Sequence, residues 1–152
     1  MRCEGEAGIE ASNRIRGIVL HDIMSRVIVP EDLEASVQES LGSGEITGAQ
    51  VDAVRTLLSG RMAQASGYGW FAGDEVQVLN EAGIIDTDGS EYRPDRVIVY
   101  EDRVVIVDYK FGEHHSRYER QMKKYAELWR RMGHENVSAY LWYVDSGEVV
   151  DV

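Results

Sequence analysis

The sequence predicts a mixed α/β (α+β) domain, with a helical first part and a second part built from strands and one long helix. In residues 1–66, apolar residues recur at spacings of three and four, which is typical of helices packed on one face. In residues 67–152, runs of Val and Ile alternate with turn sequences, which predicts strands. The length of 152 residues fits a single domain, 1–152, because domains usually contain about 100–150 residues.

Three helices are expected in residues 1–66. The first ends before Pro30, and the second begins with acidic residues, which favour the positive end of a helix dipole, and ends near Gly44. The third begins after Thr47, a suitable N-cap. The three expected apolar stripes contain Ile15, Ile18, Val19, Ile23 and Val27; Leu33, Val37 and Leu41; and Val51, Val54, Leu58 and Met62.

Strands dominate the rest of the chain. Four consecutive β-branched or apolar residues, 104–107, predict a strand buried on both faces and therefore central in its sheet. The helix that follows is expected to begin at Ser116 and to end at Gly133. The expected order is a strand within residues 71–86, a strand at 92–100, a strand at 103–110, a helix at 116–132, a strand at 137–144 and a short strand at 148–152.

Composition excludes several classes of protein. With 43% hydrophobic residues the chain is able to form a core, and no stretch has the length of a membrane span or of a signal-peptide apolar segment, so we expect a cytoplasmic protein without membrane contact. A single cysteine, Cys3, excludes an internal disulfide, a four-cysteine zinc site and an iron–sulfur cluster. The 27 acidic and 16 basic residues give a net charge of −11, which argues against an independent nucleic-acid binder.

Charged residues gather at the end of the expected central strand. Because side chains alternate along a strand, Asp108 and Lys110 project from one face and Tyr109 from the other. Alone, this pair is equally consistent with an ordinary ion pair. Asp95 lies on the preceding strand, where Pro94 favours a kink, and antiparallel pairing places it within a residue or two of Asp108. Two carboxylates and an ammonium group at one place suit Mg²⁺ or Mn²⁺ and a negatively charged reaction centre.

Four sequence blocks resemble a known family. Arg93–Val97 and Val107–Lys110 resemble the PD-(D/E)XK nuclease superfamily, and especially the RecB-type nuclease domain at the C-terminus of UvrD-like and AddA-like helicase–nucleases. Gly17–His21 matches that family's G-x-x-x-H motif, and Gln121–Tyr125 matches its Q-x-x-x-Y motif. The blocks occur in the family's order. The resemblance implies a restriction-endonuclease-like αβββαβ core, with a central mixed sheet flanked by helices.

The resemblance also assigns roles to residues. Lys110 orients or polarises the attacking water and stabilises charge on the phosphate. Gln121 and Tyr125 support the site and contact the DNA backbone. Glu81, expected to begin the strand before Asp95, is a further candidate for a position near the metal. By resemblance, the catalytic residues are Asp95, Asp108 and Lys110, and the ligands of Mg²⁺, or alternatively Mn²⁺, are His21, Asp95, Asp108 and the backbone carbonyl of Tyr109.

The function implied by the resemblance is Mg²⁺-dependent hydrolysis of DNA, by an exonuclease in preference to an endonuclease, in repair or recombination. The expected partners are DNA and helicase domains, fused or separate, since no G-x-x-x-x-G-K-[ST] motif for ATP binding occurs in this chain. Basic residues cluster between Arg117 and Arg131, either as a solvated face or as a track for phosphates. The alternative function is a non-catalytic module that keeps the nuclease fold to bind DNA or protein.

Overall fold

The computed structural model describes residues 16–75 and 77–152, and the expectations that involve Cys3, Ile15 and Val76 lie outside these ranges. Residues 16–25 form the first described helix. Within the described residues no helix has the length and apolar character needed to cross a membrane. The remaining elements are α2 (Asp32–Ser43), α3 (Val51–Ser66), β1 (Gln77–Asn80), β2 (Ile84–Ile85), β3 (Glu91–Tyr92), β4 (Arg96–Val99), β5 (Val104–Lys110), α4 (Ser116–Arg131), β6 (Val137–Tyr143) and β7 (Glu148–Asp151).

A five-stranded mixed sheet with the order β1-β4-β5-β6-β7 forms the centre of the fold. Strand β4 is antiparallel to both β1 and β5, whereas β5 and β6 are parallel and are connected through α4. Strand β5 is central and buried on both faces, so the prediction from its β-branched run is confirmed. The structure is therefore a mixed α/β fold, as the sequence predicts.

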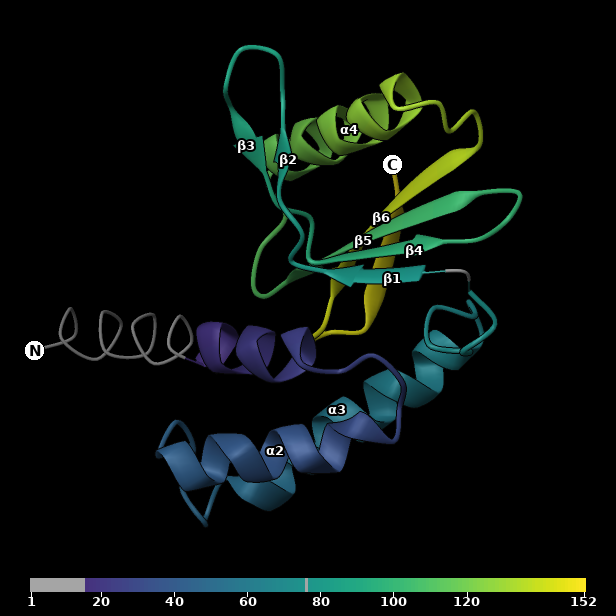
Figure 1. The fold of residues 1–152 in the computed structure, drawn as a ribbon. Coiled ribbons are helices and arrows are strands. Elements are labelled where there is room, and N and C mark those ends of the chain that lie inside the picture. Colours follow the sequence, from purple (N-terminus) through teal and green to yellow (C-terminus); the bar gives the residue numbers. More distant parts are fainter. Residues whose placement is uncertain (1–15, 76) are drawn as a thin grey trace, which may run out of the picture.

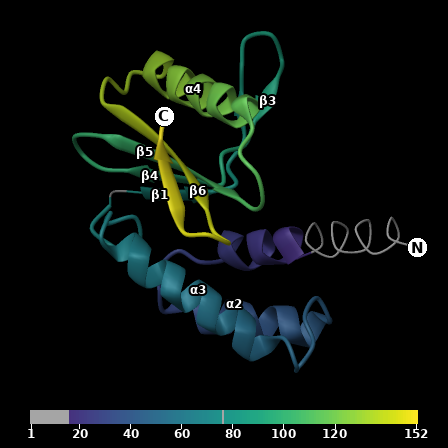
Figure 2. The ribbon, with the colours of Figure 1, turned by 180° about the vertical axis from the view of Figure 1, so that it is seen from behind.

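Helices cover both faces of the sheet (Figure 1). The helix at 16–25, α2 and α3 lie on one face, where Ile23, Leu58 and Trp142 belong to a common core. Helix α4 lies on the opposite face and packs Met122 and Tyr125 against the other side of β5 and β6. Seen from behind, the same three layers are visible, with α4 and the helices α2 and α3 on opposite sides of the strands (Figure 2).

Two of the expected strands are interrupted. The segment 71–86 contains β1 and β2, and the segment 92–100 contains β3 and β4, with β2 and β3 forming a separate two-stranded hairpin. The interruption between β3 and β4 includes Pro94, which has no N–H group for a strand ladder. The expected position of Glu81 at the start of a strand is wrong, because Glu81 follows the last residue of β1 and has a φ of 54°.

The helical part differs from the expectation in two details. Ile18 is 57% exposed, whereas Leu20 and Met24 are buried beside Ile23, so the buried stripe of the first helix is shifted around its axis. The N-cap of α3 is Gln50 instead of Thr47. The side chain of Gln50 accepts a hydrogen bond from the Thr47 backbone N–H, which makes Thr47 the first residue of a turn before the helix.

Candidate functional site

Asp108 and Lys110 lie at the C-terminal end of β5, on the face that α4 covers. They share this face with Ile106, while Tyr109 packs on the opposite face, as strand alternation requires. The Lys110 Nζ atom lies 3.2 Å from Asp108 Oδ2 and donates a hydrogen bond to Gln121 Oε1 at 3.2 Å. Asp108 is only 3% exposed, so its charge is largely removed from water and depends on these partners.

Asp95 meets Asp108 through the backbone. The register pairs Arg96 with Val107, so the next residues, Asp95 and Asp108, lie opposite one another as predicted. The Asp95 N–H donates to Asp108 Oδ1 at 2.9 Å, and the Tyr109 N–H donates to Asp95 Oδ2 at 2.7 Å. Each of the two carboxylates thus accepts a hydrogen bond from a backbone N–H, and these bonds hold the carboxylates close together where the chain bends after Pro94.

His21 and Glu81 complete a cluster around Asp95. The His21 Nε2 atom is hydrogen-bonded to Asp95 Oδ1, and His21 Nδ1 lies 3.5 Å from Glu81 Oε1. One ligand atom from each of these three residues lies within 4.8 Å of the others. Glu81 reaches this position because its N–H donates to the Asp95 carbonyl at 3.0 Å and its positive φ turns the chain at the end of β1.

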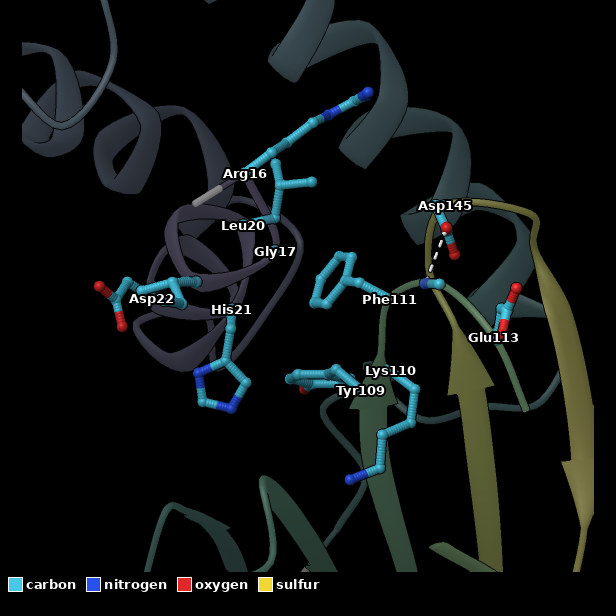
Figure 3. A pocket seen from close by; sticks show the side chains of 12 residues that line it. Arg16, Gly17, Leu20, His21, Asp22, Tyr109, Lys110, Phe111, Glu113 and Asp145 are labelled. Atoms are coloured by element: carbon cyan, nitrogen blue, oxygen red, sulfur yellow. Dashed lines mark hydrogen bonds between the residues drawn. The ribbon is translucent and has the colours of Figure 1, made fainter. Parts of the chain in front are cut away.

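A groove of about 750 Å³ opens beside the cluster (Figure 3). His21 and Lys110 both line it, from the first helix and from β5. Gly17 permits this arrangement, since a Cβ atom at its position would lie 3.3 Å from the Phe111 Cβ. The absence of a side chain at Gly17 lets the helix that carries His21 approach the end of β5 closely.

The electrostatics of the site are those of crowded negative charge. Burial, reinforced by the neighbouring Asp95, raises the pKa of Asp108 to about 6, although Lys110 opposes this change. The hydrogen bond to Asp95 raises the pKa of His21, with smaller contributions from the charges of Glu81 and Asp108, while burial acts in the opposite direction. A bound cation would neutralise part of this negative charge.

The donor set fits a hard divalent cation. Glu81 and Asp95 offer carboxylate oxygens and His21 offers an imidazole nitrogen, in a cluster that is negatively charged. Two of the expected ligands, His21 and Asp95, thus lie together, and Glu81 joins them. The Asp108 carboxylate is linked to the cluster by the hydrogen bond that it accepts from the Asp95 N–H. The metal-ligand role expected for the Tyr109 carbonyl stays a prediction.

The supporting residues fall into two groups. Gln121 contacts Lys110 directly, whereas Tyr125 is buried below the site and packs edge-to-face on Tyr92 at 6.2 Å between ring centroids. Tyr125 therefore suits support of the site better than contact with DNA. Two polar residues that the sequence-based prediction omits, Asn80 and Arg96, bind backbone carbonyls behind the cluster. No motif or spacing in the sequence indicates this role.

Comparison with known proteins finds no matching family model and no matching curated protein. The interpretation of the site therefore rests on its residues and their geometry.

Proposed function

We propose that this chain is a metal-dependent DNA nuclease domain of the PD-(D/E)XK superfamily, of RecB type, and acts as an exonuclease. The observation that carries the proposal is the convergence of Asp95, Asp108 and Lys110 at the end of β5, next to His21 and an open groove. Burying an incompletely paired carboxylate costs several kcal/mol, on the order expected for a buried ion. A cluster of this kind is therefore better explained by chemistry than by stability.

The topology supports the proposal. Strands β1, β4 and β5 form an antiparallel set, α4 follows, and β6 returns parallel to β5. This order, preceded by a helix and with the β2–β3 hairpin inserted between β1 and β4, is compatible with the αβββαβ core that the family resemblance implies. The proposed catalytic residues lie on β5 and immediately before β4, so both acids come from one antiparallel pair of strands.

Each side chain has a distinct task in the proposed reaction. His21, Glu81 and Asp95, with Asp108 beside them, would hold Mg²⁺ or Mn²⁺. When bound, the cation supplies Lewis-acid polarisation of the phosphate and orientation of a water molecule. Lys110, fixed by Asp108 and Gln121, donates a hydrogen bond to the scissile phosphate or its attacking water and stabilises the negative charge that develops.

The charge of the chain suggests how DNA reaches this site. At −11 the domain repels DNA on average, and its own phosphate contacts are expected to be weak and sensitive to salt. We therefore include in the proposal helicase domains, fused or separate, that deliver the strand during repair or recombination.

The test is cleavage of linear single-stranded, linear blunt-ended and circular DNA with Mg²⁺, Mn²⁺ or EDTA. Cleavage of the linear substrates alone, abolished by EDTA, is expected. Lys110→Met is expected to lower kcat by about 100- to 1000-fold, since it removes a donor to the reacting phosphate. Arg103→Met, which removes an exposed cation at the turn before β5, is the control and is expected to cleave as the wild type does.

Two outcomes would contradict the proposal. Undiminished cleavage by a folded Asp108→Ala protein would show that the buried carboxylate has no catalytic role. Wild-type protein that binds Mn²⁺ in calorimetry but cleaves no DNA would favour a non-catalytic module with the same fold.

A further inference from the structure

Arg96 is a fully buried arginine whose bonds go to uncharged groups. Its exposed fraction is 0%, and its guanidinium donates to the carbonyls of Val27, Ile28 and Trp70 at 2.8 to 3.2 Å, and to Asn80 Oδ1 at 3.4 Å. The guanidinium carbon also lies 4.0 Å from the centroid of the Phe71 ring. Burial lowers the pKa of Arg96, and the charges of Tyr109 and Glu75 oppose this change only in part, so the placement of the cation requires an explanation.

Two of the three carbonyls that Arg96 binds, those of Val27 and Ile28, follow the helix that carries His21, and the third, that of Trp70, follows α3. The His21 helix ends at residue 25, and the carbonyls of its last turn and of the residues just after it have no partner inside the helix. Asn80 Nδ2 donates to the Ser25 carbonyl at 3.1 Å and to the Val27 carbonyl at 2.9 Å, and Arg96 donates to the same Val27 carbonyl at 2.9 Å. A cation at this end of a helix is also favoured by the helix dipole.

Asn80 and Arg96 lie directly opposite one another on the neighbouring strands β1 and β4, and each is adjacent in sequence to a member of the metal cluster. They are a register pair of β1 and β4. The residue after Asn80 is Glu81, and the residue before Arg96 is Asp95, and these two are joined by the Glu81 N–H to Asp95 carbonyl bond at 3.0 Å. The pair thus holds the end of the His21 helix at the place where the two carboxylates leave their strands.

We propose that Asn80 and Arg96, which we call the strand-end clamp, are positioning residues that set the distance between His21 and the carboxylates of Glu81 and Asp95. This inference rests on the proposed function. His21 lies one helical turn before Ser25, so a displaced helix end moves its imidazole relative to the strands. Lysine is unable to replace Arg96, because one ammonium group does not reproduce the planar fork that reaches several carbonyls at once.

The inference is tested with Arg96→Lys and Asn80→Ala in the complete chain. Residues that support metal ligands typically contribute about 10- to 100-fold to metal affinity or activity. We expect both variants to bind Mn²⁺ in calorimetry about 10- to 100-fold more weakly than the wild type, and to show a lower kcat with an unchanged KM for an oligonucleotide. Binding of Mn²⁺ in the absence of DNA provides a readout that is independent of turnover.

Two matched controls separate positioning from stability. Arg61 donates to the carbonyls of Val144 and Asp145, and Gln64 donates to the Gly147 carbonyl. Like the clamp residues, both bind backbone carbonyls of residues distant in sequence, but these carbonyls belong to the turn after β6. Arg61→Lys and Gln64→Ala are expected to lower the melting temperature while Mn²⁺ affinity and kcat stay at wild-type values.

The outcomes are distinct. A folded Arg96→Lys or Asn80→Ala protein with wild-type Mn²⁺ affinity overturns the inference, and so do controls that lose as much affinity as the clamp variants. If Arg96→Lys does not fold, Asn80→Ala decides, because it removes one partly buried side chain and leaves the arginine in place. Wild-type protein that neither binds Mn²⁺ nor cleaves DNA overturns the proposed function itself, whereas wild-type activity with an unaffected Asn80→Ala overturns the clamp alone.

Discussion

Asp108→Asn is expected to remove a pH-dependent loss of stability from the metal-free protein. The carboxyl of Asp108 is buried beside Asp95, and its pKa is raised from the ordinary value of 3.8 to about 6. A raised pKa means that the folded protein holds this proton more tightly than the unfolded chain does. The contribution of Asp108 to the free energy of unfolding therefore falls as the pH rises from about 4 through about 6, and the full penalty is present above that range.

The size of the effect follows from the two pKa values. The difference between 3.8 and about 6 corresponds to about 3 kcal/mol when the group is fully ionised, at about 1.4 kcal/mol per pH unit. Roughly half of this penalty is already present at about pH 5 because the unfolded carboxyl is ionised there. Between about pH 5 and about pH 8, the stability of Asp108→Asn relative to the wild type should thus increase by the remaining half, on the order of 1 kcal/mol.

Urea unfolding followed by circular dichroism in EDTA measures this difference. Asparagine keeps an oxygen for the Asp95 N–H and has no charge to titrate, so groups that do not interact with Asp108 contribute equally to both proteins and cancel. His21, whose pKa the Asp108 charge helps to raise, changes the difference in the same direction. Asp102→Asn, at an exposed carboxylate of the turn before β5, is the control and should show no such trend. A stability difference between wild type and Asp108→Asn that is the same at both pH values would refute the reasoning.

Two further perturbations test the surroundings of the site. Asp86→Asn is expected to lower the melting temperature near neutral pH, because the hydrogen bond from Lys124, a backbone N–H and a nearby arginine depress the pKa of Asp86. Because the pKa is depressed, the Asp86 carboxylate stabilises the fold at pH values above its ordinary pKa of 3.8, and this stabilisation is lost as the pH falls. The difference in melting temperature between wild type and Asp86→Asn should therefore become smaller on acidification. A difference in melting temperature that does not change with pH would contradict the stabilising role of Asp86. Gly17→Val is expected to weaken Mn²⁺ binding about tenfold in calorimetry by pushing the helix away from Phe111. Gly60→Val, whose Cβ meets nothing within 4 Å, should bind as the wild type does, and equal affinities for both variants would refute the role of Gly17.

The central part of the fold was predictable because its signals are local. The apolar run 104–107 requires a strand covered on both faces, and β5 is that strand. The short turn before it forces antiparallel pairing with the preceding strand, which is sufficient to bring Asp95 opposite Asp108. The separation of the β2–β3 hairpin from the main sheet was not predicted, since propensity shows where strands and turns form but not where a kink such as that at Pro94 divides one strand into two.

Two features of the site depend on contacts between distant residues. Glu81 was a candidate for a position near the metal, but it reaches the cluster through its own positive φ at the end of β1, a conformation that glutamate rarely adopts and that no sequence rule anticipates. Arg96 belongs to the block Arg93–Val97, where a charged residue on a strand would ordinarily be placed in solvent. Its burial follows from carbonyls of residues 27, 28 and 70, which become its neighbours only after the helical part has packed on the sheet.

The structure also bears on whether the basic residues of α4 form a solvated face or a track for phosphates. Lys124 and Arg131 both pair with Asp86 at 3.0 Å, so part of the basic cluster fixes the β2–β3 hairpin to α4. Arg117, Arg120, Lys123 and Arg130 are exposed on the same helix, which contacts Lys110 through Gln121. Four exposed cations on one helix of a domain with a net charge of −11 give only a short stretch of favourable potential for a phosphate backbone. The electrostatics therefore suit a domain that receives a strand already held by a partner, in accordance with the proposed dependence on helicase domains.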